Sequence, residues 1–223
     1  MTFDDAFSAE TRLILSYSPA HLRPIFGGIL SLDRQLGAIV AQARDPHLAR
    51  IRLAWWGEQF LGLGPSSRPA DPDLRFAATL VCHHDVKPAT LSGLTQGWDL
   101  LLGDGGITPE ALAAYGKLRG GTIFAIAAQI AGCDVVACEM IGSAWALTDF
   151  AFRCSTPETA HRAAEMANTQ FVAHPPHMLR RHLMSFALLA HFAKRDLKRG
   201  PEQPRPTGHP WRAAQALSFA LFG

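Results

Sequence analysis

The sequence predicts an all-α fold in which residues 1–223 form a single helical domain. Proline and glycine divide the chain into segments, and these segments carry apolar residues at helical spacing. No segment alternates apolar and polar residues with β-branched side chains over a useful length, as a strand would. A chain of 223 residues can bury a substantial core, and neither an internal repeat nor a domain boundary divides it.

Capping residues mark the ends of the predicted helices. Ser8 is placed to cap a first helix, and Asp45 is followed by a proline at the first helical position. Thr108 and Thr156 each precede a proline in the same way. Together with the apolar spacing, these signals predict helices over residues 8–16, 19–43, 46–62 or 46–64, 72–84, 88–103, 108–132, 134–153, 156–170, 177–198 and 209–222, with proline-rich loops at 65–72 and 199–210.

The composition excludes several classes of protein. Hydrophobic residues make up 48% of the chain and charged residues 18%, which is typical of a globular domain and excludes disorder. A formal charge of +2 gives no case for nucleic acid as a partner. No apolar run approaches the ~20 residues of a spanning helix, and the start lacks a signal peptide, so we expect a cytoplasmic protein. The four cysteines form no Cys-x-x-Cys pair and are expected to be reduced and buried.

The first motif lies in residues 32–41, which read LDRQLGAIVA. This segment resembles the first catalytic helix of the squalene/phytoene synthase family, in which an arginine precedes a cluster of aspartates that hold Mg²⁺. Arg34 matches that arginine, but the aspartate positions are Gly37, Ala38 and Ala41. The resemblance implies an isoprenoid-synthase-like helical bundle with a central cavity. Glycine and alanine offer no oxygen ligand, so half of the expected metal site is lost.

The second motif lies in residues 141–149, which read IGSAWALTD and resemble the Leu-Gly-x-Ala-x-Gln-Leu-Thr-Asn segment of the family. An Asp-x-x-Glu-Asp cluster follows that segment in the family, but here its positions fall on Arg153, Thr156 and Pro157. One acid remains near each helix, Asp33 in the first and Asp149 in the second. Asp149 lies one turn before Arg153, so it either pairs with that arginine or remains as a metal ligand.

The third motif lies in residues 115–122, which read YGKLRGGT and resemble the family's Tyr-x-x-x-Val-Ala-Gly-Thr segment. Tyr115 matches a tyrosine that takes part in the condensation chemistry, and Thr122 matches the final threonine. Arg119 stands where the family has an apolar residue that lines the prenyl cavity. A guanidinium in a hydrocarbon tunnel is costly unless it is paired. Either the cavity is altered or Arg119 points elsewhere.

A fourth motif, RLAWW at residues 52–56, resembles the Arg-Leu-x-Trp-Trp of a divergent branch of the family. That branch includes a mitochondrial assembly factor for respiratory complex I, and its aspartate motifs are also eroded. Trp55 and Trp56 are interpreted as packing residues of the core and of a groove. Arg34 and Arg52 are either diphosphate-binding relics or partners of nearby acids, with Asp33, Asp45 and Glu58 as the candidates.

Two spatial expectations follow from the motifs. The helices at residues 19–43 and 134–153 should face each other across the central cavity. The glycine pairs at 27–28 and 120–121 lie within predicted helices, where each glycine costs about 1 kcal/mol relative to alanine. We therefore expect them at places where two helices approach closely.

These motifs predict a catalytically inactive relative of the synthases that holds neither metal nor cofactor. Its partner would be a protein at a respiratory membrane complex or a prenyl lipid. A basic–apolar–basic pattern at residues 178–199 is consistent either with peripheral contact at the inner membrane or with an ordinary solvated helix face. The alternatives are an active Mg²⁺-dependent enzyme that condenses prenyl diphosphates, using Asp33, Asp149 and a bound cation, and a prenyl-lipid carrier. The candidate relics of the cavity and diphosphate site are Arg34, Gly37, Ala38, Ala41, Arg52, Tyr115 (the one relic of catalysis), Arg119, Thr122, Asp149 and Arg153.

Overall fold

The computed structural model describes residues 7–103 and 106–222, and these residues form helices and no β-strand. The all-α prediction is therefore confirmed. The elements in chain order are α1 (Ala9–Ser16), α2 (Arg23–Ala41), α3 (Pro46–Leu61), α4 (Pro72–His84), α5 (Pro88–Asp99), η2 (Leu100–Leu102), α6 (Pro109–Tyr115), η3 (Gly116–Gly121), α7 (Thr122–Ala131), α8 (Val135–Ala151), α9 (Pro157–Ala173), η4 (Pro176–Leu179), α10 (Met184–Leu197) and α11 (Trp211–Phe222).

Three helices begin at capping residues that the sequence indicates, with the predicted side-chain hydrogen bond. The side chains of Ser8, Asp45 and Thr108 each accept a hydrogen bond from a backbone N–H of the first turn, at 3.1, 2.8 and 3.2 Å. Such caps satisfy N–H groups that have no partner within the helix. Thr156 also precedes its helix, but its side chain makes no capping hydrogen bond, and the start of α9 relies on the proline that follows.

Two predicted helices are not continuous α-helices. The run predicted at residues 108–132 contains the π-helical turn η3 between α6 and α7. The helix predicted at 177–198 is split, because a 3₁₀ turn (η4) ends before Arg180 and α10 begins at Met184. Between them, Arg180 donates a hydrogen bond to the backbone oxygen of Ala220 in α11 (3.2 Å), and Leu183 is buried. Contacts with distant segments therefore replace the local helix there.

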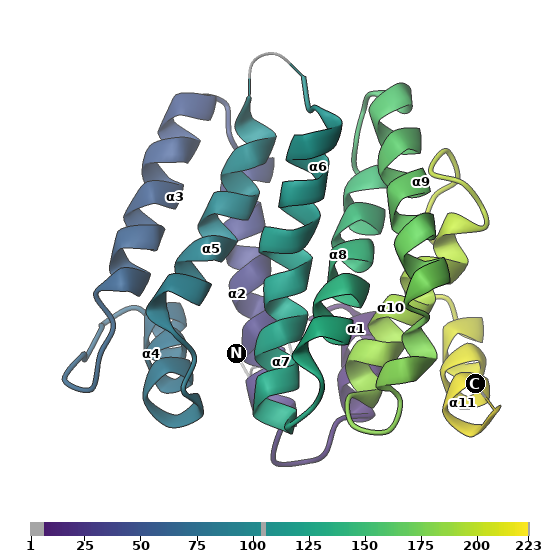
Figure 1. The fold of residues 1–223 in the computed structure, drawn as a ribbon, viewed down its shortest axis with the longest axis horizontal. Coiled ribbons are helices and arrows are strands. Elements are labelled where there is room, and N and C mark those ends of the chain that lie inside the picture. Colours follow the sequence, from purple (N-terminus) through teal and green to yellow (C-terminus); the bar gives the residue numbers. More distant parts are fainter. Residues whose placement is uncertain (1–6, 104–105, 223) are drawn as a thin grey trace.

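The helices pack side by side into one bundle, with α3 at one edge and α11 at the other (Figure 1). Helix α2 lies behind α5 and α7 in this view, so the centre of the bundle is enclosed by helices on several sides. Edge-to-face contacts join Phe26, Phe124 and Phe186, whose ring centroids are 5.1 and 5.0 Å apart. These three rings connect α2, α7 and α10, and aromatic pairs in this geometry stabilise a core beyond the area that they bury.

Glycine permits a close approach between η3 and α8, as the sequence predicts for one of its glycine pairs. A Cβ atom on Gly120 would lie 2.0 Å from the backbone oxygen of Gly142 and 2.6 Å from Cβ of Ala146. Real Cβ atoms do not come this close to a backbone oxygen. In the other pair, a Cβ on Gly28 would lie 2.3 Å from the ring of Phe76. The contact at Gly120 requires the absence of a side chain, whereas at Gly28 the ring of Phe76 would have to move.

The two tryptophans of the RLAWW motif face different surroundings. Trp56 is buried, with 6% of its surface exposed, and it packs against Phe60. Trp55 is 47% exposed, so the interpretation of this residue as a core residue is wrong. Leu48 and Ile51 are also exposed and lie seven and four residues before Trp55. These three residues form one apolar stripe on the outer face of α3, which we call the α3 ridge.

The cysteines are free thiols, as expected, but they are not uniformly buried. Cys82 is exposed, Cys133 and Cys154 are half-buried, and Cys138 is buried. Burial raises the pKa of the Cys138 thiol to about 12, so this group stays protonated at neutral pH. Within residues 7–103 and 106–222, no helix combines the length and the apolar character needed to cross a bilayer.

Candidate functional site

Three charged side chains from distant parts of the sequence meet at the centre of the bundle. Asp33 is on α2, Arg119 is on η3 and Asp149 is on α8. Their exposed fractions are only 5, 4 and 4%. Helices α2 and α8, which the motifs predict to face each other, thus each supply one acid to Arg119. We call these three residues the central ion cluster.

The guanidinium of Arg119 binds both carboxylates. Its Nε and Nη2 donate to the two oxygens of Asp33 at 2.9 and 2.8 Å, a bidentate arrangement. Its Nη1 donates to Oδ2 of Asp149 at 2.9 Å and to the hydroxyl of Tyr115 at 2.5 Å. The paired geometry meets the requirement for burying a cation, because each charge has a partner and good hydrogen bonds.

Aromatic rings enclose the arginine. The guanidinium carbon lies 4.2 Å from the ring centroid of Trp98 and 4.8 Å from that of Trp145, within range for cation–π attraction. The indole nitrogen of Trp98 also donates to Oδ1 of Asp33 at 3.1 Å. Arg119 therefore points into the centre of the bundle, where the family resemblance places a hydrocarbon cavity.

Arg119 and Asp149 keep their charges at neutral pH. Burial raises the pKa of Asp149, but Arg119 and then Arg153 and Arg205 lower it, and the net pKa lies well below the usual range. Burial is the largest single influence and lowers the pKa of Arg119, but Asp33, Tyr115 and Asp149 together raise it above its ordinary value, so this group stays charged. Burial raises the pKa of Tyr115, which therefore remains a neutral phenol. The centre holds one cation between two anions, with a neutral hydroxyl beside them.

Asp149 also binds two further arginines at the outer side of the cluster. Nε of Arg153 lies 3.1 Å from Oδ1 of Asp149, which is the pair one turn apart that the sequence suggests. Nη1 of Arg205, in the proline-rich loop before α11, lies 3.1 Å from the same oxygen. Asp149, the candidate metal ligand, thus forms ion pairs with three arginines.

From Arg205, ion pairs continue to the first and last helices. Nε of Arg205 lies 3.0 Å from Asp196 of α10, and Arg212 of α11 lies 2.6 Å from Asp196 and 3.0 Å from Glu10 of α1. Sequence reasoning missed these residues, because no local spacing relates them. The ion-pair chain, as we call it, runs through Asp33, Arg119, Asp149, Arg205, Asp196, Arg212 and Glu10.

The remaining candidate relics are dispersed. Gly37 lies against the centre, since a Cβ atom there would be 2.8 Å from the ring of Trp98. The structure places Arg34 and Ala41 at the exposed surface of α2, where Arg34 lies over a phenylalanine ring, and Ala38 is half-buried. Two more relics lie on other helices, Arg52 exposed on α3 and Thr122 half-buried at the start of α7. Tyr115, Arg119, Asp149 and Arg153 are the candidates that the structure brings together.

The residues at the centre do not fit a Mg²⁺–diphosphate group. Mg²⁺ needs several oxygen ligands in octahedral geometry, and the two carboxylates here already share the guanidinium of Arg119. The positive charge between them also opposes a second cation. Across the described residues, no three His, Cys, Asp or Glu side chains gather as a metal site requires.

Comparisons of the chain with protein-family models, with curated proteins and with solved structures gave no match. The resemblance to the squalene/phytoene synthase family stays a prediction from the sequence motifs.

Restoring one lost aspartate is expected to weaken the fold without creating a metal site. In Gly37→Asp the new side chain must displace the ring of Trp98, so we expect the free energy of unfolding to fall by about 1–3 kcal/mol. Titration calorimetry with Mg²⁺ and a prenyl diphosphate analogue should detect no gain in binding. Ala41→Asp, at an exposed position, is the control and should change stability by at most about 0.5 kcal/mol. Mg²⁺-dependent binding by Gly37→Asp would contradict this account of the centre.

Proposed function

We propose that this protein is a catalytically inactive relative of the squalene/phytoene synthases that acts by binding a protein partner during the assembly of a respiratory membrane complex. One observation carries the inactive part of the proposal: Arg119 is bound between Asp33 and Asp149. An active synthase needs free carboxylates here to hold Mg²⁺ and, through it, a substrate diphosphate. This chain has a built-in cation in the same region.

The packing around Arg119 supports the same conclusion. Trp98 and Trp145 lie over the guanidinium, and Tyr115 is buried with its hydroxyl hydrogen-bonded to Arg119. A substrate would have to displace rings that stabilise the cation and separate buried ion pairs, which is costly. Tyr115, the one candidate relic of catalysis, has a structural partner that accounts for its hydroxyl.

The α3 ridge supports the binding part of the proposal. Trp55 belongs to the motif shared with the complex I assembly branch, and it lies at the surface with Leu48 and Ile51. Tryptophan is enriched among the residues that dominate binding energy at protein interfaces. An exposed tryptophan in an apolar stripe offers such an anchor, whereas Trp56 of the same motif serves the core.

The role in assembly predicts a separation between two substitutions. Trp55→Ala should abolish function while lowering stability by at most about 1 kcal/mol, because the residue is half-exposed. Tyr115→Phe should cost about 1 kcal/mol for one lost hydrogen bond and leave function intact. The readout is respiratory complex I activity in a deletion strain that is complemented with each variant. Val172→Ala, an exposed apolar position on α9, is the matched control for Trp55→Ala and should behave as the unmodified protein.

Three results would replace this proposal. Normal complex I activity in the deletion strain would exclude the assembly role. Mg²⁺-dependent conversion of a prenyl diphosphate by the purified protein, or a changed carotenoid or hopanoid profile in the strain, would identify an active condensing enzyme. A prenyl lipid that co-purifies with the folded protein would identify a lipid carrier.

A further inference from the structure

The outward face of α11 is apolar and carries no charge. Leu217, Leu221 and Phe222 are 54, 61 and 84% exposed. The one charged residue of this helix, Arg212, is buried in the ion-pair chain. A helix at the surface of a soluble bundle ordinarily carries charged side chains on its outer face. A face without them, at the edge of the molecule, suggests that something other than water covers it (Figure 1).

The chain around α11 is strongly basic. Residues 174–223 contain eight Lys and Arg against two acids, a formal charge of +6, so the rest of the chain carries −4 of the total of +2. Both acids are occupied, since Asp196 belongs to the ion-pair chain and Glu202 pairs with His161. Six of the cations form no ion pair with a carboxylate of the described residues: Arg180, Arg181, Lys194, Arg195, Lys198 and Arg199.

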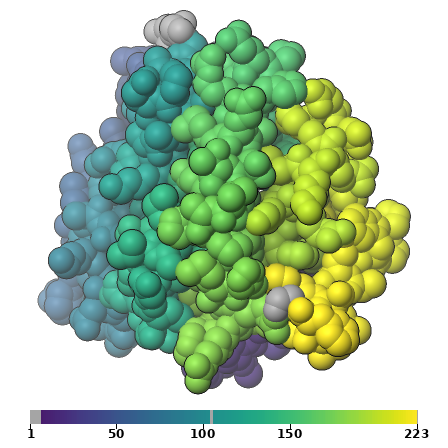
Figure 2. All heavy atoms as spheres, turned by 45° about the vertical axis from the view of Figure 1, so that its right-hand side comes forward, coloured from purple at the N-terminus to yellow at the C-terminus, as the bar shows by residue number. Residues whose placement is uncertain are grey.

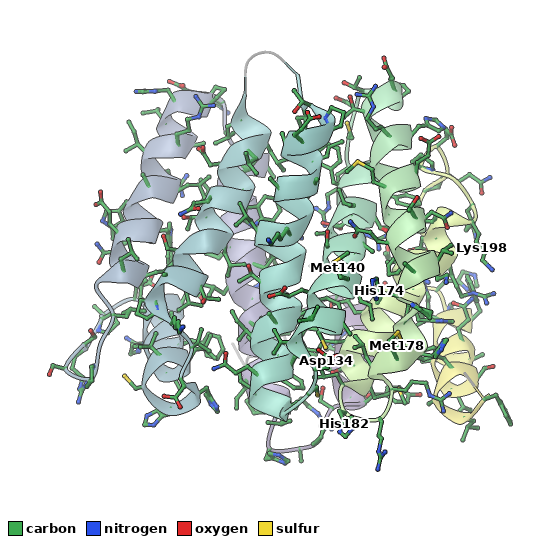
Figure 3. All side chains as sticks on the ribbon, viewed as in Figure 1. Asp134, Met140, His174, Met178, His182 and Lys198 are labelled. Atoms are coloured by element: carbon green, nitrogen blue, oxygen red, sulfur yellow. The ribbon has the colours of Figure 1, made fainter. Side chains whose placement is uncertain are left out.

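Arg180 and Arg195 lie beside the apolar face, whereas Lys194 donates a hydrogen bond to the backbone oxygen of Phe171 in α9. Arg180 donates a hydrogen bond to the backbone oxygen of Ala220, next to Leu221. Arg195 and Phe222 line the same surface hollow of about 410 Å³ between α10 and α11. The C-terminal residues form one continuous surface on the right of Figure 2, and Lys198 lies at the same edge of the bundle as α11 in Figure 3.

We infer that α11 and its flanking cations bind an anionic membrane surface. Leu217, Leu221 and Phe222 would enter the interface between lipid headgroups and chains, and the cations would contact lipid phosphates. Cations that pair with no carboxylate of the described residues fit a surface that presents many negative charges at once. Each cation near such a surface strengthens binding about fivefold at low salt. The inference does not depend on the proposed function, because this face lies at the opposite edge of the bundle from the α3 ridge.

Vesicle co-sedimentation of the full chain tests the inference. We expect binding to vesicles of phosphatidylcholine with phosphatidylglycerol, little binding to phosphatidylcholine alone, and a loss of binding at high salt. The double variant Leu217→Ser with Phe222→Ser and the double variant Lys198→Glu with Arg199→Glu should each weaken binding at least about tenfold. Circular dichroism would establish that each variant is folded.

A matched change on the α3 ridge provides the control. Leu48→Ser with Ile51→Ser removes two exposed apolar residues from the opposite edge and should leave vesicle binding unchanged. The inference is wrong if anionic vesicles do not bind the protein at low salt, or if the α11 variants bind as well as the unmodified chain. A dimer that is lost in the Leu217→Ser, Phe222→Ser variant, without vesicle binding, would assign the face to a second copy of the chain. Vesicle binding and complex I activity are measured independently. The membrane inference and the proposed assembly role can therefore fail separately.

Discussion

Replacing Arg119 with methionine is expected to lower the free energy of unfolding by about 3–5 kcal/mol. Methionine is long enough to fill much of the space but carries no charge. Asp33 and Asp149, with exposed fractions of 5 and 4%, would lose the cation that they share. Leaving a buried carboxylate without its partner costs far more than the intact pair contributes. Urea unfolding at neutral pH measures the loss.

Two further variants separate charge from packing in this experiment. Arg153→Met removes another partner of Asp149, but the Arg153 side chain is 72% exposed, so the loss should be at most about 1 kcal/mol. Adding Asp33→Asn to Arg119→Met removes the carboxylate that has lost its charge partner and should recover part of the stability, whereas Asp149 keeps Arg153 and Arg205 as partners. Equal losses for Arg119→Met and Arg153→Met would contradict the account of the central ion cluster.

Acid should act on the unmodified protein and on the Arg119→Met variant in different ways. The depressed pKa of Asp149 means that its contribution to stability is present above its ordinary pKa of about 4 and is lost as the pH falls below that value. In Arg119→Met, Asp33 has lost its guanidinium partner and can take up a proton instead. The difference in stability between the two proteins should therefore narrow as the pH is lowered towards 4.

Gly120→Ala should be the second most damaging change, with a loss of about 3 kcal/mol or more, at the upper end of the range for overpacking. The added Cβ would lie 2.0 Å from the backbone oxygen of Gly142, so η3 and α8 would have to separate. A flexible side chain could move away, but a backbone atom of a helix cannot. Thermal unfolding measures the effect.

The neighbouring glycine is the control for this substitution. A Cβ on Gly121 would lie 3.3 Å from the backbone oxygen of Glu139, a contact that small adjustments relieve. Alanine also has a higher helix propensity than glycine by about 1 kcal/mol, which offsets the remaining strain. Gly121→Ala should therefore stay within about 1 kcal/mol of the unmodified protein. A similar loss in both variants would show that the space at Gly120 is not the cause.

Local chemistry explains why the helices could be predicted and the ion cluster only in part. The caps at Ser8, Asp45 and Thr108 act within a single turn and can be read from neighbouring residues. Arg119 could be recognised as a cation that needs a partner, and the aspartates near each helix were visible. The contact between them could not be predicted from the sequence, because Arg119 lies 86 residues from Asp33 and 30 residues from Asp149.

The exposure of Trp55 could not be predicted for a different reason. The outer stripe of α3, the α3 ridge, and the inner one, with Leu53, Trp56 and Phe60, are both apolar at helical spacing. Periodicity alone cannot identify which of two apolar stripes faces the core. The loop residue Arg205 had no periodicity at all, so its place in the ion-pair chain depends on how α10 and α11 pack.

The ion-pair chain also sets an order of events during synthesis. At roughly 5–20 residues per second, the 56 residues between Asp149 and Arg205 take about 3–11 s to be made. During that interval, Asp149 has only Arg119 and Arg153 as partners. Glu10 is made earlier still, long before its ion-pair partner Arg212. Helix α1 thus gains its ion pair with α11 only after Arg212 has been made. A pause in translation before residue 205 would leave acids of the core without their final counterions.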